Sequence, residues 1–165
     1  MQTPYRRKET YIKPKPDPYL TEAKFIELKN KLERMKASHP ILANEVKRLA
    51  EMGDFSENAG YQDAKGKLRG LNQRILELEA HLKTAVVFHP DKNTQVVRLG
   101  HQVVIESNSK QKTYTILGGA ETDPTAGIIS HSSPIGAALL GHKIGDVIKI
   151  TLADKEREFK IISIS

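Results

Sequence analysis

Met52-Gly53-Asp54-Phe55-Ser56-Glu57-Asn58-Ala59-Gly60 joins two long segments in which seam residues recur alternately three and four positions apart. In the first segment, which starts at Thr21, they are Phe25, Leu28, Leu32, Met35, His39, Leu42, Val46 and Leu49. In the second segment they are Tyr61, Ala64, Leu68, Leu71, Ile75, Leu78, Leu82 and Ala85. This alternation is typical of the seam of a coiled coil, so each segment is predicted to be one long helix.

The two predicted helices have matched lengths and almost nothing between them. Folding the chain back on itself about Phe55 places Leu49 opposite Tyr61 and Leu28 opposite Leu82. A connection this short indicates an antiparallel helical hairpin rather than two separate helices. At about 1.5 Å per residue each arm should reach roughly 45 Å, with the connecting turn at its far end.

The pattern changes after Phe88, where His89-Pro90 should end the helix and short β-branched runs follow. A short helix is expected over Ile135 to Leu140, directly after Pro134, and Ala153 to Glu156 is predicted to be a hairpin turn. The expected strands are Val103 to Glu106, Thr113 to Leu117, Gly127 to Ser130, Val147 to Leu152 and Glu158 to Ile164. The predicted fold class is α+β, an antiparallel coiled-coil finger over residues 21–88 followed by a small antiparallel β domain with one short helix over residues 89–165.

Residues 1–20 combine basic residues with prolines and should not bury a core. They are predicted to be a flexible basic tail. Two interpretations stay open: a tether to nucleic acid or to an acidic protein surface, and a simple solubilising extension.

Composition narrows the classes of function. The chain of 165 residues has no cysteine, which excludes disulfides and thiolate metal sites, and it has no apolar run long enough to cross a membrane. Its net charge of +6 favours an acidic partner such as nucleic acid. We expect a cytosolic protein without a membrane partner.

Asp54 and Glu57 lie about one helical turn apart in the connecting turn, so both carboxylates can approach one ion. Mg²⁺ usually takes only one or two protein carboxylates and keeps water or phosphate in the rest of its shell. Two acids at the end of a narrow finger therefore suit half of a metal site that another protein completes. The alternative is helix capping, because acidic residues also favour the start of a helix.

The wider string Gly53-Asp54-Phe55-Ser56-Glu57-Asn58-Ala59-Gly60-Tyr61 resembles the signature of the Gre transcript-cleavage factors, GreA and GreB. A second motif, Ile129-Ser130-His131-Ser132-Ser133-Pro134-Ile135, is similar to a C-terminal motif of that family. One departure is Gly60, where the family usually has an acid. The resemblance covers residues 20–165 and leaves the basic tail without a counterpart.

The resemblance implies a coiled-coil finger that enters the secondary channel of bacterial RNA polymerase, and an FKBP-like C-terminal domain that binds the rim of the channel. Asp54 and Glu57 would help hold a second Mg²⁺, shared with the polymerase active site, for cleavage of the extruded 3′ end of backtracked nascent RNA. Asn58 and Tyr61 would position the tip. The protein would then be a monomeric catalytic cofactor of the polymerase and not itself an enzyme, with no tightly bound cofactor of its own.

Two further sets of residues are candidates for binding. Lys65, Lys67, Arg69 and Arg74 follow the turn and could contact the RNA backbone without reading its sequence, or simply form a solvated helix face. Ser133, Pro134 and Ile135 match the family segment that contacts the polymerase, although core packing explains Ile135 equally well.

Two other functions compete with transcript cleavage. A channel-binding inhibitor would use the same finger without promoting hydrolysis, and Gly60 is its main support. A general coiled coil that binds nucleic acid or protein, of the chaperone type, is supported only by the charge balance and the basic tail.

Overall fold

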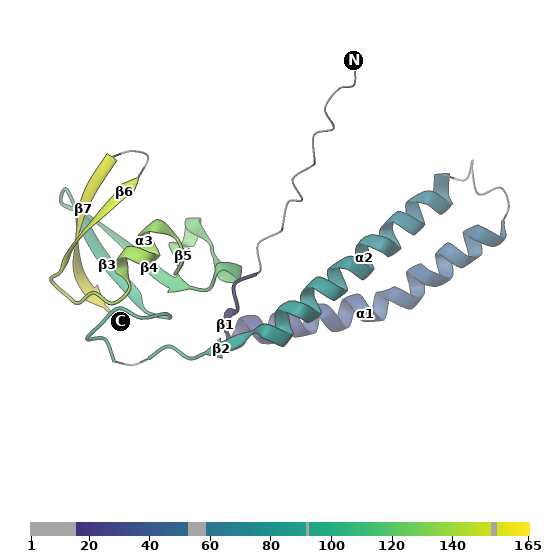
Figure 1. Ribbon diagram of the computed structural model, residues 1–165, viewed down its shortest axis with the longest axis horizontal. Helices are drawn as coiled ribbons and strands as arrows, with labels where there is room; N and C mark the ends of the chain where they lie inside the picture. Colours follow the sequence, from purple (N-terminus) through teal and green to yellow (C-terminus); the bar gives the residue numbers. More distant parts are fainter. Residues whose placement is uncertain (1–15, 53–58, 92, 153–154) are drawn as a thin grey trace, which may run out of the picture.

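The computed structural model of the chain describes residues 16–52, 59–91, 93–152 and 155–165. A finger of two helices projects from a β-sheet domain, which we call the base (residues 93–165), and the finger forms one end of an elongated molecule (Figure 1). The candidate acids Asp54 and Glu57 and the neighbouring Asn58 fall in the part of the turn that lies outside the described residues.

The finger consists of α1 (Glu22–Glu51) and α2 (Ala59–Thr84), which run side by side. Thr21 caps α1, because its Oγ1 accepts a hydrogen bond from the Lys24 N–H at 3.2 Å. Pro40 lies inside α1, and the helix continues through it. Both predicted helices are therefore confirmed.

Few side chains of the finger are buried. Among its described residues these are Leu32, Ala64 and His81. An ion pair crosses between the helices, with Lys36 Nζ 2.8 Å from Glu79 Oε1, and both side chains are more than 40% exposed. Two helices packed only on each other leave most of their surface in water, so the finger has a thin apolar seam rather than a core.

Two short strands close the finger at the end near the base. β1 (Tyr19–Thr21) pairs in parallel with β2 (Val86–Phe88), and the Val86 N–H donates to the Pro18 carbonyl at 2.7 Å. The sequence predicts a flexible tail over residues 1–20. That prediction is wrong for the last residues of the segment, because Leu20 is fully buried in β1.

The base is built on a five-stranded sheet with the strand order β5-β4-β3-β7-β6. Its strands are β3 (Gln102–Ser107), β4 (Lys110–Leu117), β5 (Ile128–Ser130), β6 (Val147–Leu152) and β7 (Lys155–Ile164). All neighbours are antiparallel except β5, which pairs in parallel with β4. The five predicted strands are present. The predicted turn was too long, because Lys155 and Glu156 already pair with Leu152 and Thr151.

One apolar cluster holds the base together. In β3, the buried Val103 and Ile105 alternate with more exposed residues, and α3 (Pro134–Leu139) contacts β5 and β6. The buried members of the cluster are Val97, Val103, Ile105, Ile116, Ile129, Leu139, Ile148, Ile150, Phe159, Ile161 and Ile164. Two 3₁₀ turns, η1 (Gly119–Glu121) and η2 (Pro124–Ala126), connect β4 to β5. The α+β fold class with one short α-helix in the base is confirmed.

No helix in the described ranges is both long enough and apolar enough to cross a membrane.

Candidate functional site

The far end of the finger is the first candidate site. Glu51 ends α1 and Ala59 begins α2 at the end of the molecule opposite the base (Figure 1). The 30 residues of α1 correspond to a length of about 45 Å. The roles of Asp54, Glu57 and Asn58 stay predictions, whereas the described helix ends at Glu51 and Ala59 lie at the far end of a long arm.

Tyr61 is the candidate tip residue that the structure does describe. It lies in the first turns of α2 and is half-buried, and Lys65 Nζ lies 5.5 Å from the centroid of its ring. That separation suits a cation–π interaction between two residues one helical turn apart. Tyr61 therefore has a packing role and a partner of its own, whether or not it also positions the tip.

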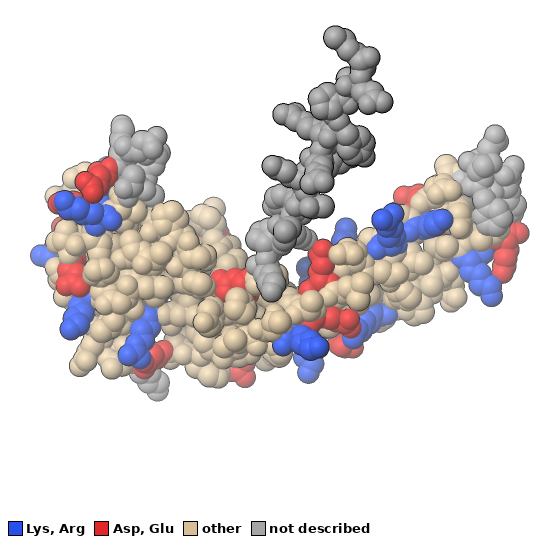
Figure 2. All heavy atoms as spheres, viewed as in Figure 1, with Lys and Arg blue, Asp and Glu red and all other residues tan. Residues whose placement is uncertain are grey.

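The four basic candidates on α2 do not share one face. Lys65 and Arg69 are four residues apart, whereas Lys67 and Arg74 point to roughly the opposite side of the helix. Lys67 Nζ lies 2.6 Å from Asp63 Oδ2, and the hydrogen bond to Asp63 raises the pKa of Lys67. Figure 2 shows Lys and Arg interleaved with Asp and Glu along the finger rather than gathered in one basic patch. A phosphate backbone on one side of α2 would meet Lys65 and Arg69 together, but not all four residues.

Ser133, Pro134 and Ile135 form the first turn of α3 and its cap. The Ser133 Oγ accepts from the Gly136 N–H at 3.0 Å and donates to the Ser130 carbonyl at 2.7 Å. Pro134 occupies the first turn of the helix, and Ile135 packs against the apolar cluster. Helix capping and core packing thus explain Ser133 and Ile135, whereas Pro134 is exposed and available for a partner.

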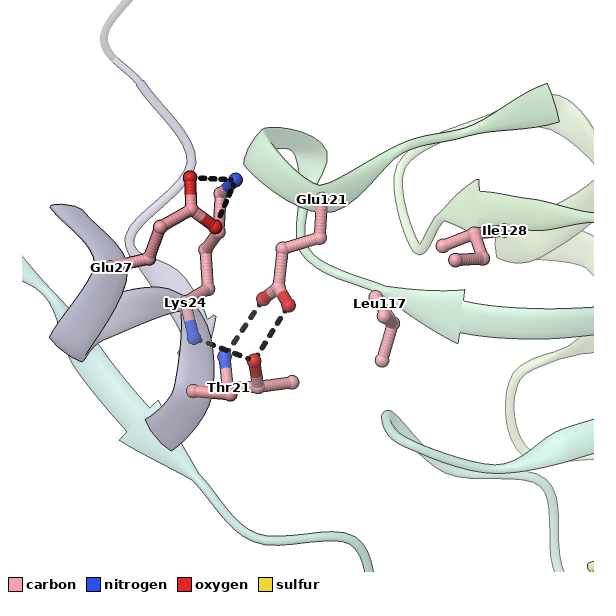
Figure 3. Close-up of a pocket in the computed structure, with 7 residues that line it drawn as sticks. Thr21, Lys24, Glu27, Leu117, Glu121 and Ile128 are labelled. Carbon is pink, nitrogen blue, oxygen red and sulfur yellow. Dashed lines mark hydrogen bonds and ion pairs between the residues drawn. The ribbon is translucent and has the colours of Figure 1, made fainter. Parts of the chain in front are cut away.

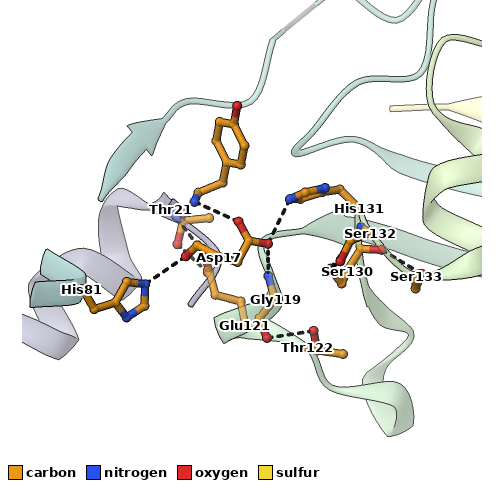
Figure 4. A network of polar contacts seen from close by, with 11 residues as sticks. Asp17, Thr21, His81, Gly119, Glu121, Thr122, Ser130, His131, Ser132 and Ser133 are labelled. Carbon is orange, nitrogen blue, oxygen red and sulfur yellow. Dashed lines mark hydrogen bonds and ion pairs between the residues drawn. The ribbon is translucent and has the colours of Figure 1, made fainter. Parts of the chain in front are cut away.

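A polar network that the sequence analysis missed lies where the finger meets the base. We call it the joint; its side chains are Asp17, Thr21, Glu121 and His131 (Figure 4). Asp17 Oδ2 accepts from the Gly119 N–H at 2.7 Å, and His131 Nε2 lies 2.9 Å from the same oxygen. Glu121 accepts from the Thr21 N–H at 2.8 Å and from its hydroxyl at 2.6 Å.

The environment of Asp17 favours its charged form. Partial burial raises the pKa of this carboxyl, but hydrogen bonds from the Gly119 and Tyr19 N–H groups and the neighbouring His131 ring lower it by more, so that the pKa lies below its usual value. The Tyr19 ring also stands edge-on to the His131 ring, with centroids 5.4 Å apart. His131 belongs to the C-terminal motif and Thr21 has an N-cap pattern, but no local sequence signal marks Asp17 or Glu121, because their partners lie about one hundred positions away along the chain.

A small cleft lies beside the joint (Figure 3). Its volume is about 260 Å³, and its lining includes Lys24, Glu27, Leu117, Glu121 and Ile128. Lys24 and Glu27 pair with each other at 2.9 Å, and Glu121 is occupied by Thr21. A cleft smaller than the usual ligand pocket, with its charged groups already paired, is the gap between two packed units rather than a binding site.

Clusters of possible metal ligands are absent from the described part of the chain. Within the described ranges, no group of three or more His, Asp or Glu side chains is placed to hold a metal ion. Near the tip, Asp63 is paired with Lys67. The assignment of Asp54 and Glu57 as ligands of a shared ion stays a prediction, because both lie outside the described residues.

Comparisons with known proteins cover nearly the whole described chain. Residues 18–87 match the sequence model described as "Transcription elongation factor, N-terminal", and residues 92–165 match "Transcription elongation factor, GreA/GreB, C-term". The transcription elongation factor GreA of Acetivibrio thermocellus is 38% identical over 141 residues, which cover 83% of this chain and 89% of that protein. GreA of Cereibacter sphaeroides is 35% identical over 148 residues, covering 88% of this chain and 98% of that protein.

Among solved structures, GreA factor homolog 1 (Gfh1) of Thermus thermophilus is 30% identical to this chain. The match covers 89% of this chain and 97% of that one, with a TM-score of 0.42.

Proposed function

We propose a function from one premise: the chain belongs to the GreA/GreB family of transcription elongation factors. In this proposal it binds RNA polymerase, inserts the tip of the finger into the secondary channel, and stimulates cleavage of backtracked nascent RNA by the polymerase active site. It acts as a cytosolic monomer and supplies residues to another enzyme's active site.

The observation that carries the proposal is the shape of the finger. Two helices packed side by side are about 20 Å across, and α1 extends about 45 Å from the base. Leu32 and Ala64 are buried, whereas the outer surface carries charged side chains of both signs beside separate exposed apolar residues such as Ile41 and Leu76. A finger with such a mixed surface can enter an aqueous channel. With Asp54 and Glu57 at its tip, a narrow arm would be suited to deliver carboxylates to a site that is closed to a globular domain.

At the tip, Asp54 and Glu57 would hold a Mg²⁺ ion together with the polymerase and the RNA phosphate. Such a shared ion would supply activation of water and charge neutralisation at the scissile phosphate. Two carboxylates leave most of an octahedral shell to other ligands, so the site should exist only in the complex. Tyr61 and Asn58 would position the tip, and Lys65 and Arg69 would contact the extruded RNA from one side of α2.

The base would hold the outer rim of the channel through the surface that includes Ser133, Pro134 and Ile135. Pro134 supports this because it is exposed and its neighbours on both sides are fixed, Ser133 by the helix cap and Ile135 by the core. A rigid exposed residue loses little entropy when a partner covers it.

The experiment adds purified protein to a backtracked elongation complex in the presence of Mg²⁺ and follows the length of the RNA. The wild-type chain should shorten the transcript. The double variant Asp54→Asn, Glu57→Gln should lose about a hundredfold or more of this activity, because both charges of the shared site are removed. The matched control Glu33→Gln, Glu156→Gln removes two exposed acids away from the tip and should cleave like wild type. Equal cleavage by the tip variant and the control would exclude Asp54 and Glu57 as the functional acids.

A second candidate function rests on Gly60, which lies exposed in the first turn of α2 at the position where the family usually has an acid. A finger with one acid fewer could occupy the channel without promoting hydrolysis and would then inhibit transcription. In the same assay, slower nucleotide addition without any shortened RNA would favour this inhibitor over the cleavage factor.

A further inference from the structure

The finger meets the base through an unusually close backbone contact. Residues 16–21 lead into α1, and β1 within them contacts β4 and η1 as well as β2. A Cβ atom added to Gly118 would lie 1.9 Å from the carbonyl oxygen of Tyr19, so backbone meets backbone with no side chain between. Leu20, the next residue, is fully buried. Contact this close leaves β1 little freedom to slide along the base.

Two carboxylates cross the joint in opposite directions (Figure 4). Asp17, from the finger side, binds the Gly119 N–H and lies beside His131 of the base. Glu121, from the base, binds both the N–H and the hydroxyl of Thr21. Because the two contacts lie at different points, a rotation of the finger about one of them would stretch the other. Hydrogen bonds to a charged acceptor resist such stretching more strongly than neutral ones.

Both helices of the finger are attached to this same segment. Thr21, which Glu121 binds, is the N-cap of α1. His81 of α2 is buried, and its Nε2 lies 2.9 Å from the carbonyl oxygen of Asp17, which can only accept, so Nε2–H is the donor. The joint therefore fixes the finger as one unit rather than only its first helix.

We infer that Asp17 and Glu121 are positioning residues that set the angle between the finger and the base, and through it the point that the tip reaches. The consequence for catalysis rests on the proposed function. With an arm of about 45 Å, a rotation of about 10° at the joint moves the tip by about 8 Å. A misplacement of only about 1 Å costs an active site roughly a hundredfold in rate. Two residues a full finger length from the candidate acids thus control whether those acids can act.

The first test measures the angle directly. The chain has no cysteine, so Asn44→Cys on α1 and Thr113→Cys on β4, both exposed, give a uniquely labelled pair for spin-label distance measurements. The Asp17→Asn, Glu121→Gln variant should give a distance distribution at least about twice as wide as that of the otherwise unchanged chain, because both charge-assisted contacts are weakened. The Glu33→Gln, Glu156→Gln control should leave the width unchanged. An unchanged width in the joint variant overturns the inference.

Glu121→Gln alone serves as a second variant, since it removes the charge at constant size, and it should give an intermediate width. Far-UV circular dichroism confirms that each variant folds, and the single variant decides the question if the double variant does not fold.

The second test uses the cleavage assay over a range of protein concentrations. The joint variant should lower the maximal cleavage rate by about tenfold or more, while the half-saturating concentration changes less, because the proposed contact residues Ser133, Pro134 and Ile135 are unchanged. Normal cleavage with a widened distribution would show that the joint does not position the tip, and the proposed function would stand. No cleavage by the wild-type chain would instead exclude the proposed function and leave the distance measurement to decide whether the joint fixes the angle.

Discussion

In the base, eleven buried side chains form one apolar cluster, whereas the described residues of the finger bury only three side chains. In place of a core, the finger has the backbone hydrogen bonds of its two helices and exposed ion pairs such as Lys36–Glu79 and Lys67–Asp63. Each of these exposed pairs contributes little to stability. Its firmest attachments lie at the end next to the base, at β1, β2 and His81. The two regions should therefore unfold separately, with the base as the stable unit and the finger opening from its far end.

The largest expected effect comes from the core of the base. Ile161 is fully buried in β7, between β3 and β6, and Ile161→Ala should lower the free energy of unfolding of the base by about 2–5 kcal/mol through loss of burial and a residual cavity. Amide hydrogen exchange on peptides from β3 and β7 measures the base, and peptides from α1 and α2 measure the finger. The control is Ile41→Ala, because Ile41 of α1 is 70% exposed and its loss should change stability by no more than about 0.5 kcal/mol. Equal losses of unfolding free energy in Ile161→Ala and Ile41→Ala would contradict the proposed difference in packing between the base and the finger.

A smaller effect of opposite sign is expected in the finger. Gly66 and Gly70 lie within α2, and an added Cβ at either position meets nothing within 4 Å. Gly66→Ala and Gly70→Ala should each stabilise the finger by about 0.5–1 kcal/mol, because alanine loses less backbone entropy than glycine in a helix. Slower exchange of the α2 amides with unchanged exchange in the base is the expected result. Gly118→Ala should have the opposite effect and destabilise the joint, because the Cβ of the new alanine would overlap the Tyr19 carbonyl oxygen.

The smallest effect is a pH dependence at the joint. The pKa of Asp17 lies below its usual value of 3.8, so the unfolded chain takes up the proton at higher pH than the folded chain does. The stabilisation by this carboxylate is therefore complete above that usual value and is lost as the pH falls through the lowered pKa of the folded state. The difference in melting temperature between wild type and Asp17→Asn should be present at pH 7 and shrink towards pH 3. A difference that stays constant over this range would show that the charge of Asp17 does not contribute.

The finger could be predicted from sequence because its information is local. The three-and-four spacing of residues such as Leu28 and Leu82 is complete within each helix, and the short turn leaves one way to arrange the pair. The strands of the base were predicted for the same reason, from short β-branched runs that each strand shows by itself. The sheet order and the parallel pairing of β4 with β5 were not available, because they depend on contacts between distant segments.

The joint could not be predicted from sequence, because it too depends on contacts between distant segments. β1 and β2 have three residues each, too few for any periodicity, and Asp17 precedes a proline as many loop residues do. The pairing of Glu121 with Thr21 appears only when segments a hundred residues apart come together. The structure shows the joint, which the sequence did not predict. At the tip, by contrast, a sequence motif identifies Asp54 and Glu57, and both lie outside the described residues.

The hydrogen bond from the Val86 N–H to the Pro18 carbonyl joins the two ends of the hairpin at its root. The described part of the finger beyond this root consists of α1 and α2, which share one seam. Adding or removing seven residues in each helix would keep the seam in phase, leave β1, β2 and the base unchanged, and change the reach by about 10 Å. The length of the finger can therefore change independently of the base and of the strand pair at the root.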